Sequence, residues 1–315
     1  MILKKTLIHN NPKRLFTFGC SFTDYLWPTW ANILGYEFRD AEFYNFGKSG
    51  AGNQYIFNMI MQADASYNFT HNDIVIVQWT NVSREDRYFH AGAPILNDSE
   101  VQHGAWSTPG NIYSQDTYDE AWIEKYFSEY GALVRDLAFI KAAHGMLKHK
   151  AQWHFLQMNN LVHYVDQWDS NVKVEDSKLP REFGNKSRVT QLRELYSETI
   201  SNLQPSFYDV LYNNNWSQKF KADRKIVNKH FQDGHPHPLE HYDYLKRVFE
   251  HNWRPSTNEK VGELQKKWVK LMHDASATAT DNKFSIYNMS TNWHNAIRHD
   301  LNIRKSEDID FRTHR

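Results

Sequence analysis

The sequence predicts an α/β fold built on a parallel sheet. Segments typical of strands and of helices alternate from residue 14 to residue 204, which is the order expected when helices connect parallel strands. The run 73–79 is rich in β-branched residues, as in a strand that is buried on both faces. Glycine and polar residues follow the strands directly, at the edge where open sheets bind their ligands. We therefore expect a three-layer sandwich in which helices cover both faces of a central parallel sheet.

Four apolar runs, each bounded by turn-forming residues, are expected to form the strands of this sheet. They are 14–19, 42–46, 73–79 and 152–158. A further short run, 207–211, is expected to add a fifth strand. Because helices connect the strands, neighbouring strands should run parallel.

The connecting helices are indicated by apolar residues at helical spacing. They begin near Pro28 and at Asn53, and they span 117–149 and 187–204. We expect the side chain of Asn53 to cap its helix. Gly35 and Pro205 are expected to end the first and the last of these helices. The helix at 117–149 is expected to break near Gly131 or Gly145.

Two polar stretches without periodicity interrupt this alternation. They are 86–116 and 159–186. We expect both to be surface insertions, and we expect the first to form a lid or a wall of the substrate site.

The end of the chain is expected to be helical and then polar. One helix is expected over 239–252, and a capping-box pattern at 256–259 starts another. From Asp274 onward the composition is polar and aperiodic, which indicates a tail. The chain thus divides into a flavodoxin-like α/β/α domain at 1–253 and a helical C-terminal extension with a polar tail at 254–315.

Composition narrows the class of protein. Lysine and arginine number 37, as do aspartate and glutamate, so no strong field favours nucleic acid or an acidic membrane surface as a partner. Cys20 is the single cysteine, which excludes an internal disulfide and a cysteine-rich zinc site. No apolar run is long enough to span a bilayer, and the first residues lack the pattern of a secretory signal. We expect a soluble protein made in a reducing cytoplasm.

Four polar sites fall in loops that follow the expected strands or precede a late helix. They are Ser21, Gly50, Asn81, and Asp233 with His235. Because the carboxyl ends of parallel strands share one edge, residues far apart in sequence can converge there. A serine hydroxyl becomes a good nucleophile when a base takes its proton, and imidazole suits that task near neutral pH.

In this order, the four sites resemble the sequence blocks of the SGNH hydrolase superfamily, the GDSL-type esterases and lipases. The matching segments are Gly19-Cys20-Ser21-Phe22-Thr23, Asn45-Phe46-Gly47-Lys48-Ser49-Gly50, Gln78-Trp79-Thr80-Asn81 and Asp233-Gly234-His235-Pro236. The resemblance implies that Ser21 is the nucleophile, that His235 is its base and that Asp233 orients the base. It also implies an oxyanion hole formed by the N–H groups of Ser21 and Gly50 and the side chain of Asn81.

The sequence departs from the family pattern in three blocks. Cys20 stands where the first block usually has aspartate, and Asn81 is all that remains of the third block. The last block usually spaces aspartate and histidine by three residues. Here His235 lies two residues after Asp233, as in acetyltransferase-like members, so we prefer it to His237, which lies four residues after. The residues of the first and last blocks are also similar to those of SGNH-like proteins encoded by tailed phages.

Several of these residues have a second interpretation. Gly47 or Gly52 could take the role of Gly50. Three tryptophans could line a sugar or acyl pocket, although filling the core is at least as common for this residue. They are Trp27, Trp79 and Trp106.

A metal site is the alternative for the histidine-rich loop. Imidazoles beside a carboxylate suit zinc, and the candidate ligands are Asp233, His235, His237 and His241. The prolines of this loop restrict it, and no second cluster of ligands is obvious in the sequence.

The expected function is that of a serine-dependent esterase or acyltransferase without a cofactor. Its substrate would be a small-molecule or carbohydrate ester, such as an O-acetylated carbohydrate, and we expect neither nucleic acid nor membrane as a partner. The alternative is a non-catalytic binding or virion-structural protein on an SGNH-like scaffold, which the altered blocks and the polar tail suggest. The sequence leaves the acyl group, the leaving group and the oligomeric state open.

Overall fold

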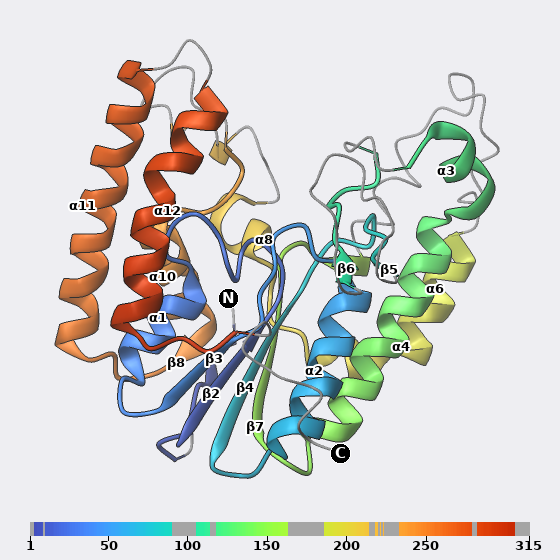
Figure 1. Cartoon of the computed structure of the whole chain (residues 1–315). Helices are drawn as coiled ribbons and strands as arrows, with labels where there is room; N and C mark the ends of the chain where they lie inside the picture. The colour runs from blue at the N-terminus through green and yellow to red at the C-terminus, as the bar shows by residue number, and fades with distance from the viewer. Residues whose placement is uncertain are drawn as a thin grey trace.

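A sheet of four parallel strands forms the centre of the protein (Figure 1). The computed structural model describes residues 3–8, 10–89, 105–113, 118–162, 186–213, 218–219, 221, 223, 233–278 and 282–305. The strands are β2 (Arg14–Phe18), β3 (Glu42–Asn45), β4 (Asp73–Trp79) and β7 (Gln152–Gln157), in the order β3, β2, β4, β7. The predicted α/β class and the four predicted strands are confirmed.

The centre of the sheet is as apolar as the sequence indicated. β4 pairs with β2 on one side and β7 on the other, and every one of its residues is buried. The two strands on one side of β4 contribute aromatic rings to the core: Phe16 of β2 stacks on Tyr44 of β3, with ring centroids 4.6 Å apart. Because all four strands are parallel, their carboxyl ends lie at one edge of the sheet.

The predicted fifth strand at 207–211 is wrong, because this segment forms helix α8 (Phe207–Tyr212). The hydroxyl of Ser206 accepts a hydrogen bond from the backbone N–H of Asp209 at 3.1 Å and so caps the helix. The position beside β7 is taken instead by a short extended stretch, in which Leu203 pairs with Phe155. A six-residue apolar segment fits a strand or a helical turn equally well by its pattern alone.

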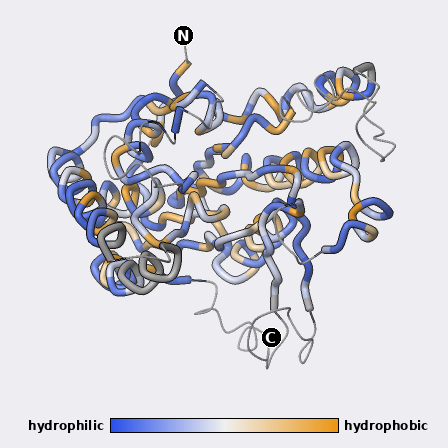
Figure 2. Tube along the Cα trace, turned by 90° about the horizontal axis from the view of Figure 1, so that it is seen from above, coloured by the Kyte–Doolittle hydropathy of each residue, from blue (hydrophilic) through white to orange (hydrophobic). Residues whose placement is uncertain are grey.

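Helices lie on both sides of the sheet. In Figure 1, α1 (Trp30–Glu37), α10 (Pro238–Val248), α11 (Pro255–Thr278) and α12 (Asn282–Asp300) lie on one side of it, and α2 (Asn53–Tyr67), α4 (Glu129–Leu147) and α6 (Lys186–Leu195) on the other. Figure 2 shows hydrophilic and hydrophobic residues alternating along the turns of the outer helices, as expected for helices with one face on a core. None of the helices in the described ranges is long and apolar enough to cross a bilayer.

Three predicted helix ends are placed differently. Gly35 lies inside α1, where a Cβ would come within 2.7 Å of the Phe43 ring, so this glycine allows close helix–strand packing. The helix predicted at 117–149 is divided at residues 127–128 into α3 (Glu120–Tyr126) and α4, and not at Gly131 or Gly145. The hydroxyl of Ser128 accepts a hydrogen bond from the N–H of Gly131 and caps α4. The helix predicted at 187–204 is likewise divided, into α6 and α7 (Ser197–Ser201).

The C-terminal part is more ordered than its composition predicted. α10 ends at Val248, and the next two residues form β8 (Phe249–Glu250), which pairs with β1 (Lys5–Thr6). α11 starts at Pro255, so the capping-box residues lie within its first turns. The aperiodic tail predicted from Asp274 is wrong over the described residues 274–278 and 282–305, because α11 continues and α12 follows it. Three apolar residues at intervals of four, Trp293, Ile297 and Leu301, are buried and attach this segment to the core.

The two predicted insertions are only partly described. In the first, β5 (Arg87–Phe89) and β6 (Ala105–Ser107) form an antiparallel pair, while 90–104 and 114–116 lie outside the described residues. Of the second, 163–185 lie outside them. β5 follows β4 closely, so this pair lies near the carboxyl edge of the sheet.

Candidate active site

Ser21 lies just past the end of β2, in a tight turn. The N–H groups of Thr23 and Asp24 both donate to the carbonyl oxygen of Cys20, at 2.8 and 3.1 Å. A Cβ on Gly19 would come within 2.0 Å of the Thr23 hydroxyl, so this position requires glycine. Cys20 is fully buried, as expected for a side chain that points into the core.

His235 brings Ser21 and Asp233 into one chain of hydrogen bonds. Its Nε2 lies 2.8 Å from Oγ of Ser21, and its Nδ1 lies 2.7 Å from Oδ1 of Asp233. The backbone N–H of His235 also donates to Oδ1 of Asp233, at 2.8 Å. With the imidazole proton on Nδ1, Nε2 is free to accept the proton of the serine hydroxyl.

The electrostatics of Asp233 fit an ionised carboxylate. Burial by itself raises the pKa of this carboxyl. The hydrogen bonds and the charge of His235, together with a hydrogen bond from Tyr25, outweigh burial and hold the pKa of Asp233 below its ordinary value. The carboxylate therefore stays ionised near neutral pH, where it can accept the hydrogen bond from Nδ1 of His235.

Among the three glycines that follow β3, Gly50 is distinguished by its free N–H. The N–H of Gly47 donates to Oδ1 of Asn45 at 3.0 Å, and that of Gly52 to Oδ1 of Asp86 at 2.8 Å. No acceptor for the N–H of Gly50 lies among the residues that the structure describes. Gly50 adopts a φ of 76°, and a Cβ there would come within 2.0 Å of the carbonyl oxygen of Thr108. This position therefore requires glycine for two independent reasons.

Asn81 follows β4 and is held by its own loop. Its Oδ1 accepts a hydrogen bond from the N–H of Ser83 at 2.8 Å, which fixes the plane of the amide. Within the described part of the chain, its Nδ2 group has no acceptor. Two donors in the loops that follow β4 and β3, Nδ2 of Asn81 and the N–H of Gly50, thus have no acceptor among the described residues.

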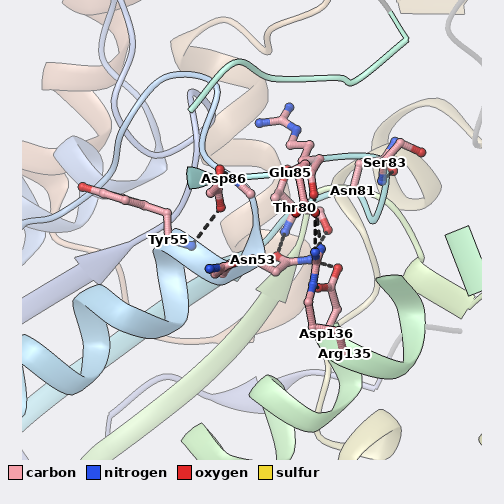
Figure 3. A network of polar contacts seen from close by, with 12 residues as sticks. Asn53, Tyr55, Thr80, Asn81, Ser83, Glu85, Asp86, Arg135 and Asp136 are labelled. Carbon is pink, nitrogen blue, oxygen red and sulfur yellow. Dashed lines mark hydrogen bonds and ion pairs between the residues drawn. The ribbon is translucent and has the colours of Figure 1, made fainter. Parts of the chain in front are cut away.

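A buried carboxylate joins these two loops (Figure 3). Asp86 accepts from the N–H of Gly52 with one oxygen and from the N–H of Tyr55 with the other, each at 2.8 Å. It therefore caps α2 from a distant loop. Burial raises the pKa of Asp86 to about 6, although both N–H groups act in the opposite direction.

The prediction that Asn53 caps α2 is wrong, because its side chain points elsewhere. Its Oδ1 accepts from the N–H of Thr80 at 2.8 Å, and its Nδ2 donates to Oδ2 of Asp136 at 2.7 Å (Figure 3). Asp136 is fully buried beside Arg135, and burial raises its pKa to about 7. Asn53 thus connects the end of β4 to α4, a role that a local capping pattern could not indicate.

The histidines of the late loop have three different surroundings. His237 Nδ1 accepts a hydrogen bond from the N–H of Glu240 at 3.4 Å and caps α10. His241 is buried, with its ring against the rings of Phe22 and Phe207. The geometry therefore brings only His235 to Ser21.

One group of possible metal ligands is found among the described residues: Asp223, His237 and Glu240. The ammonium group of Lys219 lies 2.6 Å from Oδ1 of Asp223 and 2.8 Å from Oε2 of Glu240. This buried lysine supplies the positive charge that the two carboxylates require. The ligand set is thus already satisfied by the chain itself, and it does not include His235 or His241, so it differs from the set predicted from the sequence.

The aromatic residues near the site divide into core and surface positions. Trp27 and Trp79 are buried, so these two tryptophans fill the core. Trp106 is partly buried and lies beside Lys48, whose Nζ donates to its carbonyl oxygen at 2.8 Å. Of the three tryptophans, Trp106 alone stays a candidate for contact with a substrate.

Tyr25 is the residue that the motifs did not indicate. Its ring stacks on the imidazole of His235 with centroids 3.7 Å apart, and its hydroxyl donates to Oδ2 of Asp233 at 2.8 Å. It lies four residues after Ser21, on the same turn. An aromatic residue close after the candidate nucleophile was the available signal, but aromatic residues are so frequent in this chain that it was not distinctive.

Comparisons with known proteins give little beyond this geometry. No family model matches the sequence, and a comparison with curated proteins gives no match. Among solved structures, the chain is similar to a protein from Veillonella parvula DSM 2008 described as a member of the lipolytic protein G-D-S-L family. The TM-score is 0.34 and the sequence identity 15%, over 74% of this chain and 94% of that one.

Proposed function

We propose that this protein is a serine-dependent hydrolase of the SGNH type that acts on ester bonds. The observation that carries the proposal is the chain of hydrogen bonds from Ser21 through His235 to Asp233, at 2.8 and 2.7 Å. A hydroxyl, an imidazole and a carboxylate in this order form the arrangement by which serine hydrolases activate their nucleophile. It needs no cofactor.

The reaction follows from the positions of these three side chains. Oγ of Ser21 attacks the ester carbonyl carbon while Nε2 of His235 takes the hydroxyl proton. Asp233 keeps the proton on Nδ1 and stabilises the imidazolium that forms. When the tetrahedral intermediate collapses, Nε2 returns its proton to the departing alkoxide. Water, or another hydroxyl in the case of acyl transfer, then repeats the sequence on the acyl-enzyme.

The oxyanion would be bound by donors that have no other acceptor in the described structure. These are Nδ2 of Asn81 and the N–H of Gly50, together with the N–H of Ser21 itself. Each such donor contributes on the order of 3 kcal/mol to the stability of the transition state. Because Gly47 and Gly52 use their N–H groups within the protein, Gly50 is the glycine that fits this role.

The experiment that tests this function is labelling with a fluorophosphonate, which reacts with activated serine hydroxyls. We expect the wild-type protein and Ser49→Ala, an exposed serine in the loop that follows β3, to be labelled, and Ser21→Ala to remain unlabelled. Labelling that persists in Ser21→Ala would contradict the assignment. A folded wild-type protein that is not labelled would favour the non-catalytic binding or virion-structural protein on the same scaffold.

The finer parts of the proposal concern the substrate and the whole fold. We propose an O-acetylated carbohydrate as the substrate, supported by the partly exposed Trp106 close to the Gly50 loop. Release of acetate from acetylated oligosaccharides, compared with release from a small aryl acetate, tests this choice. For the whole chain we propose a flavodoxin-like α/β/α domain at 1–253 with a C-terminal extension at 254–315.

A further inference from the structure

Tyr25 fixes both partners of the candidate acid–base pair. Its ring lies nearly parallel to the imidazole of His235, at an interplanar angle of 17°. Its hydroxyl occupies Oδ2 of Asp233, the carboxylate oxygen that His235 does not use. Burial and the nearby carboxylate raise the pKa of Tyr25, so the phenol keeps its proton and acts as a donor. Together these contacts restrict rotation of the imidazole and of the carboxylate.

Neighbouring contacts hold the backbone of the same loop. Nε1 of Trp27 donates to the carbonyl oxygen of Pro236 at 2.9 Å, and the hydroxyl of Tyr208 donates to that of Gly234 at 3.1 Å. These bonds place the backbone around His235, but they leave its side chain free to rotate. The ring of Phe22 also lies near the imidazole, with centroids 5.4 Å apart, but Tyr25 contacts both the imidazole and the carboxylate.

The backbone of Tyr25 is in turn held by the C-terminal part of the chain. Nδ1 of His294, on α12, lies 2.9 Å from the carbonyl oxygen of Tyr25. Nζ of Lys305 pairs with the carboxylate of Asp24, the preceding residue, and lies 3.3 Å from Nε2 of His294. Both side chains of the Lys305–Asp24 pair are largely buried. Removing one partner of such a pair is costly, because it leaves the other charge without compensation.

The edge of the sheet anchors this contact. The N–H of Arg304 donates to the carbonyl oxygen of Phe43, and its carbonyl oxygen accepts from the N–H of Asn45, at 3.0 and 2.9 Å. Residue 304 thus extends the sheet beyond β3 in the parallel sense. Lys305 is thereby placed next to the turn that carries Asp24.

We propose that α12 and residues 303–305 act as a positioning element for the Asp233–His235 pair, with Tyr25 as the residue through which they act. We call His294, Arg304 and Lys305 the C-terminal clamp. The inference rests on the proposed function, since it gives that function a requirement for the C-terminal extension. The clamp does not touch the reacting atoms: it fixes the backbone of Tyr25, and Tyr25 fixes the planes of the imidazole and the carboxylate.

The test compares three variants of the full chain with the wild-type protein. Tyr25→Phe keeps the ring and removes the hydrogen bond to Asp233, and His294→Ala removes the contact between α12 and Tyr25. Tyr36→Phe is the matched control, because the hydroxyl of Tyr36 donates to Oδ2 of Asp300 on the same α12 at 2.9 Å, away from the pair. The first readout is the NMR signal of the His235 Nδ1 proton, assigned by its loss in His235→Gln. The second is the separate measurement of kcat and KM on an aryl acetate.

We expect the Nδ1 proton signal to shift or to broaden through exchange with water in Tyr25→Phe and, to a smaller extent, in His294→Ala. In Tyr36→Phe it should match the wild type. We expect kcat to fall about 10-fold in Tyr25→Phe with KM unchanged, as when an interaction that orients a charged group is lost. An unchanged signal in Tyr25→Phe or in His294→Ala, or an equal effect of Tyr36→Phe, would overturn the proposal.

The two readouts separate this inference from the proposed function. If the Nδ1 signal responds as expected but the wild-type protein neither cleaves the aryl acetate nor reacts with fluorophosphonate, the positioning role stands and the hydrolase is refuted. If the wild-type protein is active and Tyr25→Phe retains its kcat and its Nδ1 signal, the hydrolase stands and the positioning role is refuted.

Discussion

Substitution of Gly50 by alanine tests the oxyanion hole where the structure is most restrictive. The new methyl carbon would lie 2.0 Å from the carbonyl oxygen of Thr108 and 3.2 Å from the backbone N of Gly110. An ordinary contact is about 3.5 Å, so one of the two backbones has to move by about 1.5 Å. The φ of 76° adds about 1–2 kcal/mol of strain for a residue with a Cβ.

Both effects displace the free N–H of Gly50. Loss of one oxyanion donor lowers kcat by roughly 100-fold or more, and we expect that loss in Gly50→Ala. The strain and the clash should also lower the free energy of unfolding by about 1–3 kcal/mol. The rate of ester cleavage and urea unfolding of the same preparation separate the two effects, since the remaining stability decides how much protein is folded in the assay.

Gly145→Ala provides the matched control. Gly145 lies inside α4, and a Cβ there meets nothing within 4 Å. Alanine in such a position stabilises a helix by about 0.4–1 kcal/mol, so this variant should be slightly more stable with kcat unchanged. A folded Gly50→Ala protein with the kcat of the wild type would refute the role of this N–H group.

Two further predictions concern stability. Asp86→Ala should lower the free energy of unfolding by about 2 kcal/mol, because the N–H groups of Gly52 and Tyr55 lose their acceptors; urea unfolding that shows no change would contradict this capping role. Burial lowers the pKa of His237 to about 4, below the value of about 6.5 for an unfolded histidine. This group therefore contributes stability above pH 6.5 that is lost as the pH falls to 4, in total about 3 kcal/mol. In His237→Gln, urea unfolding between pH 7 and pH 4.5 should show a smaller decrease, and an equal decrease would show that another group is responsible.

The strands could be predicted from sequence because they are short apolar runs that end at turn-forming residues. The same pattern placed Ser21 and Asn81 directly after strands, and the structure has them there. It could not decide between strand and helix at 207–211, where a run of six residues fits both periods. The segment after Asp274 was missed because its composition is polar overall, and the helical spacing of Trp293, Ile297 and Leu301 was overlooked.

Contacts between distant segments account for most of what the sequence did not indicate. Asp86 caps a helix that begins 33 residues before it, counted from Asn53. The hydrogen bond from Tyr25 to Asp233 joins residues 208 apart in the chain. The residues around α2 do not indicate Asp86, and those around Tyr25 do not indicate Asp233. The local candidate for the cap, Asn53, makes another contact. Such pairs become visible only when the sheet has placed its loops side by side.

The loops that carry Gly50 and Asn81 are fixed to each other by several contacts. Asp86, five residues after Asn81, binds the N–H groups of Gly52 and Tyr55. Nη1 of Arg84, from the same loop, donates to the carbonyl oxygen of Ala51 at 2.8 Å. A displacement of one loop therefore carries the other with it, and the two free donors keep their separation. For this reason the loss of Asp86 should reduce the rate of ester cleavage even in the fraction of molecules that remains folded.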